Sequence, residues 1–373
     1  MSQATGTLDL RLPAATCDAD ACRLRIRALP APDAAGSARV ALSSRGLKPE
    51  EESLLRSTSQ VQVSEVGPEF VLEFPEDPPT QPTLFGRLEA AWSNATAAKP
   101  APRIMGIVNA TPDSFSDGGV YHSSGDPRST IQHALGLVSA GCDLLDIGGE
   151  STRPGAAPVD ADEELRRVIP LISALHSQTS CPISIDTRKA TVAAAAIDAG
   201  ATMVNDVSAG LYDEELLPLV AERGVGICLM HMRGTPRDMQ DAPEYEDVVR
   251  EVLDHLRERV RACLKAGIEG NRIRIDPGIG FGKTLEHNLE LMSHLPVLRS
   301  LGLPLLLGVS RKSFIAQVTA GTDQGGGPGA RLGGTIAAVL RCADGGASVL
   351  RVHAVAETRE ALLVHRSLAK ERS

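Results

Sequence analysis

The sequence is poor in aromatic side chains and holds more acids than bases. Phe, Trp and Tyr make up 3% of the 373 residues, and 47 Asp and Glu against 38 Lys and Arg give a formal net charge of -9. Nucleic acids and anionic membranes are recognised through basic patches, so this balance argues against both as partners. The sequence also lacks an apolar run of membrane-spanning length, and its N-terminus lacks the basic and apolar regions of a secretory signal.

Cysteine pairs and histidine metal motifs are missing as well. The seven cysteines are scattered, odd in number and without a C-x-x-C pair, which indicates reduced thiols in a cytoplasmic protein. No H-x-H or H-E-x-x-H occurs, so a metal held entirely by protein side chains is poorly supported. With 42% hydrophobic residues, the chain still has ample material for a large core.

From Arg103 onward the sequence repeats one pattern, in which an apolar run leads into a polar loop and then into a helical stretch. The apolar runs with their polar ends occupy residues 103–119, 144–156, 182–189, 203–210, 226–234, 273–283, 303–314 and 349–355. The helical stretches occupy residues 128–140, 162–176, 190–199, 214–223, 244–266, 285–295, 330–342 and 357–369. Eight such units predict an α/β fold, the TIM (β/α)8 barrel, whose active face lies at the carboxyl ends of the strands. The alternative, a doubly wound open sheet, would normally open with G-x-G-x-x-G, which is missing after the first run.

Residues 1–98 do not share this pattern. Apolar residues alternate with period two at residues 8–12, 24–26, 61–63 and 70–74, which predicts short half-buried strands. Residues 48–56 and 84–98 are helical in pattern, and residues 76–82 are typical of a linker. We expect a small N-terminal α+β extension over residues 1–98 and a barrel domain over residues 99–373. The extension has no cluster of polar groups, so we interpret it as a structural or dimer-supporting element rather than a second active site.

Acids and an amide end three of the predicted strands. Asp186 ends the third, Asn205 and Asp206 end the fourth, and Asp276 ends the sixth. A carboxylate can accept two parallel hydrogen bonds, so these residues together suit a ligand rich in N–H donors. The alternative is that an Asp in this place only caps the following helix. Gly278, Gly280 and Gly282 are expected to let the backbone approach a flat ligand beside Asp276.

Cations end the last two predicted strands. Lys312 lies in a Ser-Arg-Lys-Ser stretch, and Arg351 and His353 share the eighth strand. Cations and an imidazole at one barrel mouth are expected to hold a phosphate or diphosphate leaving group. The loops at residues 110–119 and 148–158 are rich in Gly, Pro, Ser and Thr, and are either plain turns or lids that bring Arg153 over the substrate.

Three further chemistries need weighing. Residues 282–284 end like a P-loop, but Pro277 stands where that motif needs glycine, which argues against nucleotide triphosphate binding. A lysine at a strand end could form a Schiff base, yet that chemistry leaves the acids and the amide without a purpose. Mg²⁺ held by one protein oxygen and by substrate phosphates needs no motif, and Asn109 could supply that oxygen.

Eight motifs in order resemble the dihydropteroate synthase family. They are MGIVNATPDSFSDGG (Met105 to Gly119), DIGGESTRPGA (Asp146 to Ala156), IDTRK (Ile185 to Lys189), NDVSA (Asn205 to Ala209), MHMRGTPRDMQ (Met230 to Gln240), DPGIGFGK (Asp276 to Lys283), GVSRKSF (Gly308 to Phe314) and RVH (Arg351 to His353). The resemblance runs from Arg103 to the end of the chain. It implies a folate-pathway transferase that joins para-aminobenzoate to 6-hydroxymethyl-7,8-dihydropterin diphosphate and releases pyrophosphate with Mg²⁺. Sulfonamides mimic the aminobenzoate in this family, so the resemblance also implies a sulfonamide target.

The same resemblance implies a role for individual residues. The pterin would be bound by Asp186, Asn205, Asp276, Lys312 and Arg351. The diphosphate would be held by Thr152, Arg153, Arg351, His353 and Asn109, the last as a Mg²⁺ ligand. The aminobenzoate pocket would be formed by Phe115, Pro154, Phe281, Lys312 and Ser313. The residues expected to carry catalysis are Lys312, Asp186, Arg153, Arg351 and His353.

Two features depart from the family pattern, and two other functions remain open. Ala354 follows His353 where the family commonly has Asp, and the extension before residue 100 is not part of the family core. One rival is a pterin-binding barrel that transfers a methyl group to a corrinoid protein. The other is a catalytically silent paralogue that binds pterin without turnover. The resemblance also suggests a homodimer formed through the later helices of the barrel.

Overall fold

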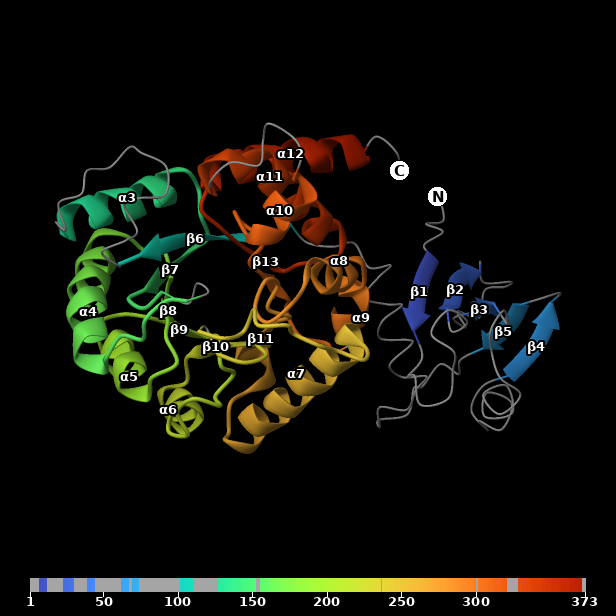
Figure 1. The fold of residues 1–373 in the computed structure, drawn as a ribbon, viewed down its shortest axis with the longest axis horizontal. Helices are drawn as coiled ribbons and strands as arrows, with labels where there is room; N and C mark the ends of the chain where they lie inside the picture. The colour runs from blue at the N-terminus through green and yellow to red at the C-terminus, as the bar shows by residue number, and fades with distance from the viewer. Residues whose placement is uncertain are drawn as a thin grey trace. The chain divides into compact units, whose positions relative to one another are not determined.

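The chain divides into two compact units, Met1–Lys99 and Pro100–Ser373 (Figure 1). The structure is a computed structural model that describes five strands within residues 7–73, followed by residues 101–110, 127–151, 155–235, 237–299, 301–320 and 328–370. The helices expected at residues 48–56 and 84–98 and the linker expected at residues 76–82 lie outside the described residues. Cys17 and Cys22 lie outside them too, and the five described cysteines are free thiols.

The first unit contains a five-stranded antiparallel sheet. Its strands are β1 (Thr7–Arg11), β2 (Arg23–Leu29), β3 (Arg39–Ser43), β4 (Gln62–Val66) and β5 (Glu69–Glu73), in the order β1-β2-β3-β5-β4. Four of them lie where the alternating pattern predicts strands, whereas β3 was not predicted.

The second unit is a parallel β/α barrel. Its strands are β6 (Arg103–Asn109), β7 (Leu144–Gly148), β8 (Ile183–Asp186), β9 (Met203–Asp206), β10 (Gly226–Met230), β11 (Ile273–Asp276), β12 (Leu306–Leu307) and β13 (Val349–Val352), in the order β11-β10-β9-β8-β7-β6-β13-β12. A parallel bridge between Ile275 and Leu305 links the two edges of this sheet. The predicted TIM barrel is therefore confirmed.

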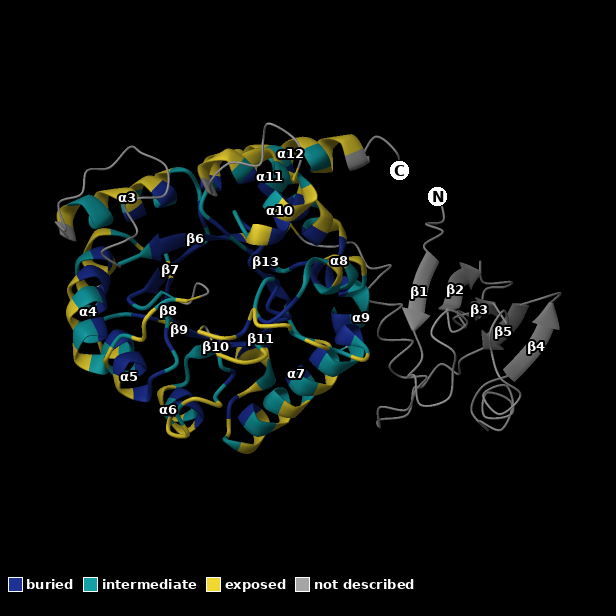
Figure 2. Cartoon of the chain, in the orientation of Figure 1, coloured by how far each residue is buried: buried dark blue, intermediate teal, exposed yellow. Residues whose placement is uncertain are grey.

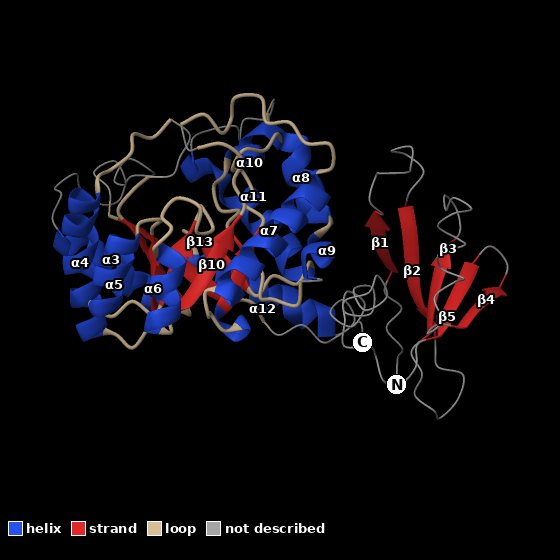
Figure 3. Cartoon of the chain, turned by 90° about the horizontal axis from the view of Figure 1, so that it is seen from below, coloured by secondary structure: helices blue, strands red, loops and turns tan. Residues whose placement is uncertain are grey.

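Helices surround the strands of the second unit (Figures 1 and 3). They are α3 (Pro127–Ser139), α4 (Ala161–Gln178), α5 (Ala190–Asp198), α6 (Leu216–Arg223), α7 (Val248–Lys265), α8 (Leu285–Ser293), α9 (Leu295–Arg299), α10 (Ser313–Val318), α11 (Leu332–Asp344) and α12 (Val355–Lys370). The eight predicted helical stretches are confirmed to within a few residues, while the short α9 and α10 were not predicted. None of the described helices is both long and apolar enough to cross a membrane.

Acidic caps fix where the two longest helices begin. Asp160 accepts a hydrogen bond from the Glu163 amide at 2.8 Å ahead of α4. Asp247 accepts one from the Arg250 amide at 2.9 Å ahead of α7. Each cap satisfies an amide that has no partner within its helix and is worth about 1 kcal/mol.

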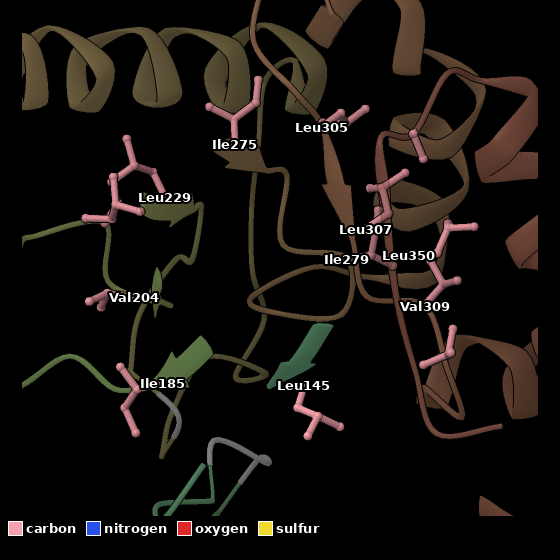
Figure 4. Packing of buried hydrophobic residues seen from close by; sticks show 14 of the residues in the cluster. Leu145, Ile185, Val204, Leu229, Ile275, Ile279, Leu305, Leu307, Val309 and Leu350 are labelled. Atoms are coloured by element: carbon pink, nitrogen blue, oxygen red, sulfur yellow. The ribbon is translucent and has the colours of Figure 1, made fainter. Parts of the chain in front are cut away.

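Two apolar clusters lie on the two faces of the barrel sheet, because side chains alternate along a strand. Leu145, Ile185 and Leu229, whose side chains are labelled in Figure 4, belong to a large cluster that also includes residues of the surrounding helices, such as Leu171 and Val252. A smaller cluster fills the barrel interior and consists of Met105, Leu144, Met203, Cys228, Leu306 and Val349. The strands are accordingly buried and the outer faces of the helices are exposed (Figure 2). Burying one Ile or Leu side chain contributes about 1.5–3 kcal/mol, so both clusters hold the strand ends in place.

Candidate active site

The barrel carries a polar layer directly above its apolar interior. Residues two positions apart on a strand point to the same face of the sheet. Asp146 on β7, Asn205 on β9 and Arg351 on β13 each follow a residue of the interior cluster by two positions. These side chains therefore face the barrel axis near the carboxyl ends of the strands, which is the active face of this fold.

Arg351 links the acids of two strands. Its Nε donates to Asp146 Oδ2 at 2.6 Å, and its Nη2 donates to Asp186 Oδ2 at 2.7 Å. Asn205 Nδ2 donates to the same Asp146 oxygen at 3.0 Å. Asp146 is fully buried, so its carboxylate fixes both the guanidinium and the amide.

The charges in this layer are strongly coupled. Burial raises the pKa of Asp186 to about 7, with Arg351 opposing the shift and Asp146 adding to it. Burial also lowers the pKa of Arg351, but Asp146 and Asp186 outweigh that effect and the net shift is upward. Arg351 therefore stays charged, whereas Asp186 takes up a proton more readily than an exposed carboxylate does.

Asp276 and Lys312 form the other charged part of the site. Burial raises the pKa of Asp276 and lowers that of Lys312 to about 8, and each group opposes the shift of the other. Asp276 Oδ1 accepts from the Gly278 amide at 2.7 Å. Lys312 Nζ donates to the Ile279 carbonyl and lies 4.3 Å from the centre of the Phe281 ring, within cation–π range.

The glycines after β11 are needed for contacts within the protein itself. Gly278 has φ 67°, and a Cβ there would lie 1.9 Å from the His231 carbonyl oxygen. A Cβ on Gly282, with φ 62°, would lie 2.3 Å from the Arg233 carbonyl oxygen. Only glycine fits such positions, so the loop packs against the end of β10. These glycines therefore allow close packing within the protein, whereas the sequence suggested only that they let the backbone approach a ligand.

Lys283 is buried behind this loop. Its Nζ lies 2.9 Å from His231 Nδ1 and donates to the Phe281 carbonyl at 2.9 Å. Burial lowers the pKa of Lys283 well below its usual value and lowers that of His231 to about 2. This lysine supports the loop from inside, which agrees with the argument against a P-loop.

His353 is oriented by a serine. The Ser310 hydroxyl lies 3.0 Å from His353 Nδ1 and also accepts from the His353 amide at 3.3 Å. Ser310 is buried and joins the ends of β12 and β13. It thus supplies a ring partner in a chain that has Ala354 where the family commonly has Asp.

A buried ionic cluster holds the base of the loop after β7. Glu150 accepts from Lys189 Nζ at 2.7 Å and from Arg188 at 3.0 Å. Lys189 also donates to the fully buried Glu164 at 2.5 Å. Because buried charges are costly unless paired, this cluster fixes the loop beside Asp186.

Asp206 does not face the barrel axis. Its carboxylate accepts from the Ser208 amide at 2.7 Å, the Ser208 hydroxyl at 2.6 Å and the Gly210 amide at 2.5 Å. Strand alternation turns it away from its neighbour Asn205. Asp206 therefore holds the turn after β9 rather than capping the following helix α6, whose N-cap is Glu215, and the prediction that it joins the polar ring was wrong.

The remaining predicted residues lie at the rim or beyond the described part. Asn109 is half-buried at the end of β6, paired in register with Gly148, and Ser313 is exposed at the start of α10. Phe115, Thr152, Arg153 and Pro154 lie outside the described residues. Within the described ranges, no group of three or more His, Cys, Asp or Glu could hold a metal ion.

Known proteins share this barrel. The family model for pterin binding enzymes matches residues 105–353. The dihydropteroate synthase of Escherichia coli K12 is 44% identical over 263 residues, which is 70% of this chain and 90% of that protein. The chain belongs to the dihydropteroate synthase family.

Solved structures of dihydropteroate synthases agree. The enzyme from Yersinia pestis in complex with a sulfonamide drug is 42% identical, with a TM-score of 0.68 over 72% of this chain and 95% of that one. The enzyme from Xanthomonas albilineans with 4-aminobenzoic acid is 49% identical, with a TM-score of 0.66 over 72% of this chain and 93% of that one. The family resemblance stated from the motifs is confirmed, and the chain has the family's activity as a transferase of folate biosynthesis.

Sequence reasoning missed one acid of this dihydropteroate synthase barrel. Asp146 lies in the middle of a strand whose five residues are all buried. The sequence feature that could have identified it is the presence of an acid inside an apolar run, two residues after Leu144. A charge there is unfavourable unless it is paired, so the run itself predicts a partner from another strand.

Proposed function

We propose that the polar layer binds 6-hydroxymethyl-7,8-dihydropterin diphosphate and that the chain condenses it with para-aminobenzoate to 7,8-dihydropteroate and pyrophosphate. The observation that carries this proposal is the pairing of Arg351 with Asp146 and Asp186 beside Asn205. The pairing places hydrogen-bond acceptors, on Asp186 and Asn205, and a cation, Arg351, in fixed positions at the same mouth of the barrel. A pterin diphosphate needs acceptors for its N–H groups and cations for its phosphates.

The acceptors suit the amino edge of the pterin. Asn205 donates its amide nitrogen to Asp146, so its carbonyl oxygen remains to accept from the ligand. One oxygen of Asp276 is held by the Gly278 amide, which leaves the other to accept. Asp186 completes the acceptor set. With a pKa near 7, it can adjust its protonation to the ring that binds.

The cations suit the ring and the diphosphate. Lys312 is anchored beside Asp276 and binds the ring from the side opposite Asn205, while the Arg351 plane stacks against it. Arg351 and His353 hold the diphosphate, together with Thr152 and Arg153 from the loop after β7. The ionic cluster of Glu150 places the base of that loop.

The donor set at this mouth fits Mg²⁺ held mainly by the substrate. Asp146 and Asp186 are already paired with Arg351, and Asn109 offers a neutral amide oxygen at the rim. Mg²⁺ commonly takes one or two protein oxygens together with substrate phosphates and water. When bound, Mg²⁺ would neutralise charge on the departing diphosphate.

The reaction breaks the bond between the pterin methylene carbon and the diphosphate oxygen, and forms a bond from that carbon to the amine nitrogen of aminobenzoate. The amine then loses a proton to solvent, and pyrophosphate leaves with the bonding electrons. Arg351 and His353 stabilise the leaving charge, and the carboxylates near the ring stabilise the positive charge left on the pterin. An aromatic amine is neutral at pH 7, so no strong base is required.

The aminobenzoate pocket is proposed beside the loop after β11. Phe281 and Lys312 are in contact there, and Ser313 opens the adjacent α10. Phe115 and Pro154 complete the proposed pocket from the first two loops. The same pocket is the proposed site of sulfonamide action.

We further propose that the enzyme is a cytoplasmic homodimer and that residues 1–98 form a domain of their own. Large apolar side chains are exposed on the later helices of the barrel, among them Leu289, Val318, Leu363, Val364 and Leu368. Such residues are unfavourable in water and favour an interface between subunits. Light scattering should show a dimer, and Leu363→Glu should shift it toward monomer, whereas a monomeric wild type would refute the dimer.

Pyrophosphate release tests the proposed reaction. Purified protein should release pyrophosphate from dihydropterin diphosphate in Mg²⁺ only when para-aminobenzoate is present, and Lys312→Ala should lose most of that rate. Binding of the pterin without turnover would instead support the silent paralogue. The matching relatives are named as dihydropteroate synthases, which speaks against methyl transfer to a corrinoid protein.

A further inference from the structure

The barrel has a second mouth, at the amino ends of its strands, and this mouth contains a cavity of about 190 Å³. The cavity is lined by residues at or next to the amino ends of strands β6, β7, β9, β10 and β11, including Arg103, Leu144, Met203, Gly226, Arg272 and Arg274. None of its described lining residues is an acid. Three arginines therefore share one cavity whose described lining includes no carboxylate.

Arg274 is the unusual residue of this group. It pairs in register with Cys228, a member of the interior cluster, and it precedes Asp276 by two residues on β11. Its side chain thus enters the barrel at a level where the described interior is otherwise apolar. Its hydrogen bond to the protein is a long one, 3.5 Å from Nη1 to the Arg272 carbonyl.

Arg103 approaches the same cavity from β6. Its Nη2 donates to the Asp143 carbonyl at 3.0 Å. Neither Arg103 nor Arg274 forms an ion pair among the described residues, whereas Arg272 pairs with Glu269 at 3.1 Å. Burial lowers the pKa of Arg274, and Arg103 lowers it further.

A glycine makes room for the guanidinium. A Cβ on Gly226 would lie 3.1 Å from Arg274 Nη1 and 3.3 Å from Met203 Cγ. An alanine there would press on the arginine side chain. The glycine at the start of β10 therefore preserves the space beside Arg274.

We propose that this second mouth binds a small oxyanion of the phosphate type between Arg103 and Arg274. A half-buried guanidinium without a carboxylate favours an anion that can accept several N–H bonds at once. A tetrahedral oxyanion has enough oxygens to bridge two arginines, and the cavity can hold one. The site lies at the opposite end of the strands from Asp276 and Arg351, so it is distinct from the proposed active site.

Titration with inorganic phosphate at constant ionic strength, followed by calorimetry and thermal unfolding, tests this proposal. Four full-length proteins are compared: wild type, Arg274→Met, Gly226→Ala, and His353→Ala as the control at the other mouth. At roughly ten times Kd, phosphate should raise the wild-type Tm by about 2–4 °C more than chloride does. Arg274→Met should bind phosphate at this site at least about tenfold more weakly, His353→Ala should keep that binding, and Arg274→Met should retain turnover.

Equal phosphate binding by wild type and Arg274→Met, or a loss confined to His353→Ala, would overturn the proposal. So would a wild type that responds to phosphate no more than to chloride. If Arg274→Met fails to fold, Gly226→Ala decides, because it keeps every charge and should weaken phosphate binding by crowding Arg274 and Met203. Unchanged phosphate binding in that variant would equally contradict the site.

Discussion

Replacing Asp146 with Asn tests whether the acid that sequence reasoning missed positions the site. Asp146 Oδ2 accepts from both Arg351 and Asn205, and its Oδ1 is buried without a hydrogen-bond partner. An asparagine at this position could keep the first two bonds through its side-chain oxygen. It would lose the charge opposite Arg351 and would bury an N–H₂ group where no acceptor stands.

The expected losses of activity and of stability follow from the contacts of Asp146. A hydrogen bond to a charged group is worth about 1.5–3 kcal/mol, so loosening Arg351 should lower kcat/KM by roughly 10- to 150-fold. The buried amide without a partner should lower the free energy of unfolding by about 1–3 kcal/mol. Removing the Asp146 charge should also lower the pKa of Asp186 and move the acidic limb of the pH profile to lower pH.

Asp206→Asn is the matched control, because Asp206 is equally buried and lies on β9. Its carboxylate serves only the turn at Ser208 and Gly210 among the described residues. It should lose similar stability while keeping kcat/KM within a few-fold of wild type. Steady-state kinetics over a pH series and urea unfolding measure both variants. Equal losses of kcat/KM in the two would refute the positioning role of Asp146.

Three other predictions follow from the same geometry. Burial lowers the pKa of Lys312 to about 8, so activity that needs its charge should fall as pH rises through about 8, and Lys312→Arg should move that fall to higher pH in a pH–rate profile. Gly278→Ala should destabilise the protein far more than Gly302→Ala in urea unfolding, because a Cβ at Gly278 meets the His231 carbonyl whereas one at Gly302 meets nothing within 4 Å. Gly302→Ala should cost about 1–2 kcal/mol for its positive φ alone, and equal costs would contradict the packing argument. Asn109→Ala should raise the Mg²⁺ concentration needed for half-maximal rate, and an unchanged Mg²⁺ dependence would exclude Asn109 as a ligand.

The barrel could be predicted because its signals are local and repeated. Each strand is an apolar run with a polar end, and each run is followed by a stretch with a helical pattern. The elements that escaped prediction are short. Within the barrel these are α9, with five residues, and α10, with six, and neither contains enough of a period to be recognised.

The sequence predicted which residue types form the site, but it did not predict which way each side chain points. Asn205 and Asp206 are neighbours in sequence, yet one faces the barrel axis and the other its own turn. Asp146 was overlooked because it lies inside a strand rather than at its end. Ser310 contacts His353 and Lys283 contacts His231. Both contacts join segments that are distant in sequence, so no local sequence pattern predicts them.

A crystal structure with dihydropterin diphosphate and Mg²⁺ bound would test the proposed site most directly. We expect the amino edge of the pterin to donate to the Asn205 carbonyl oxygen and to Asp276, with Lys312 on the opposite side and the diphosphate beside Arg351 and His353. A pterin that lies away from Asn205 and Asp276, with Arg351 still held by Asp146 and Asp186, would contradict the proposed site.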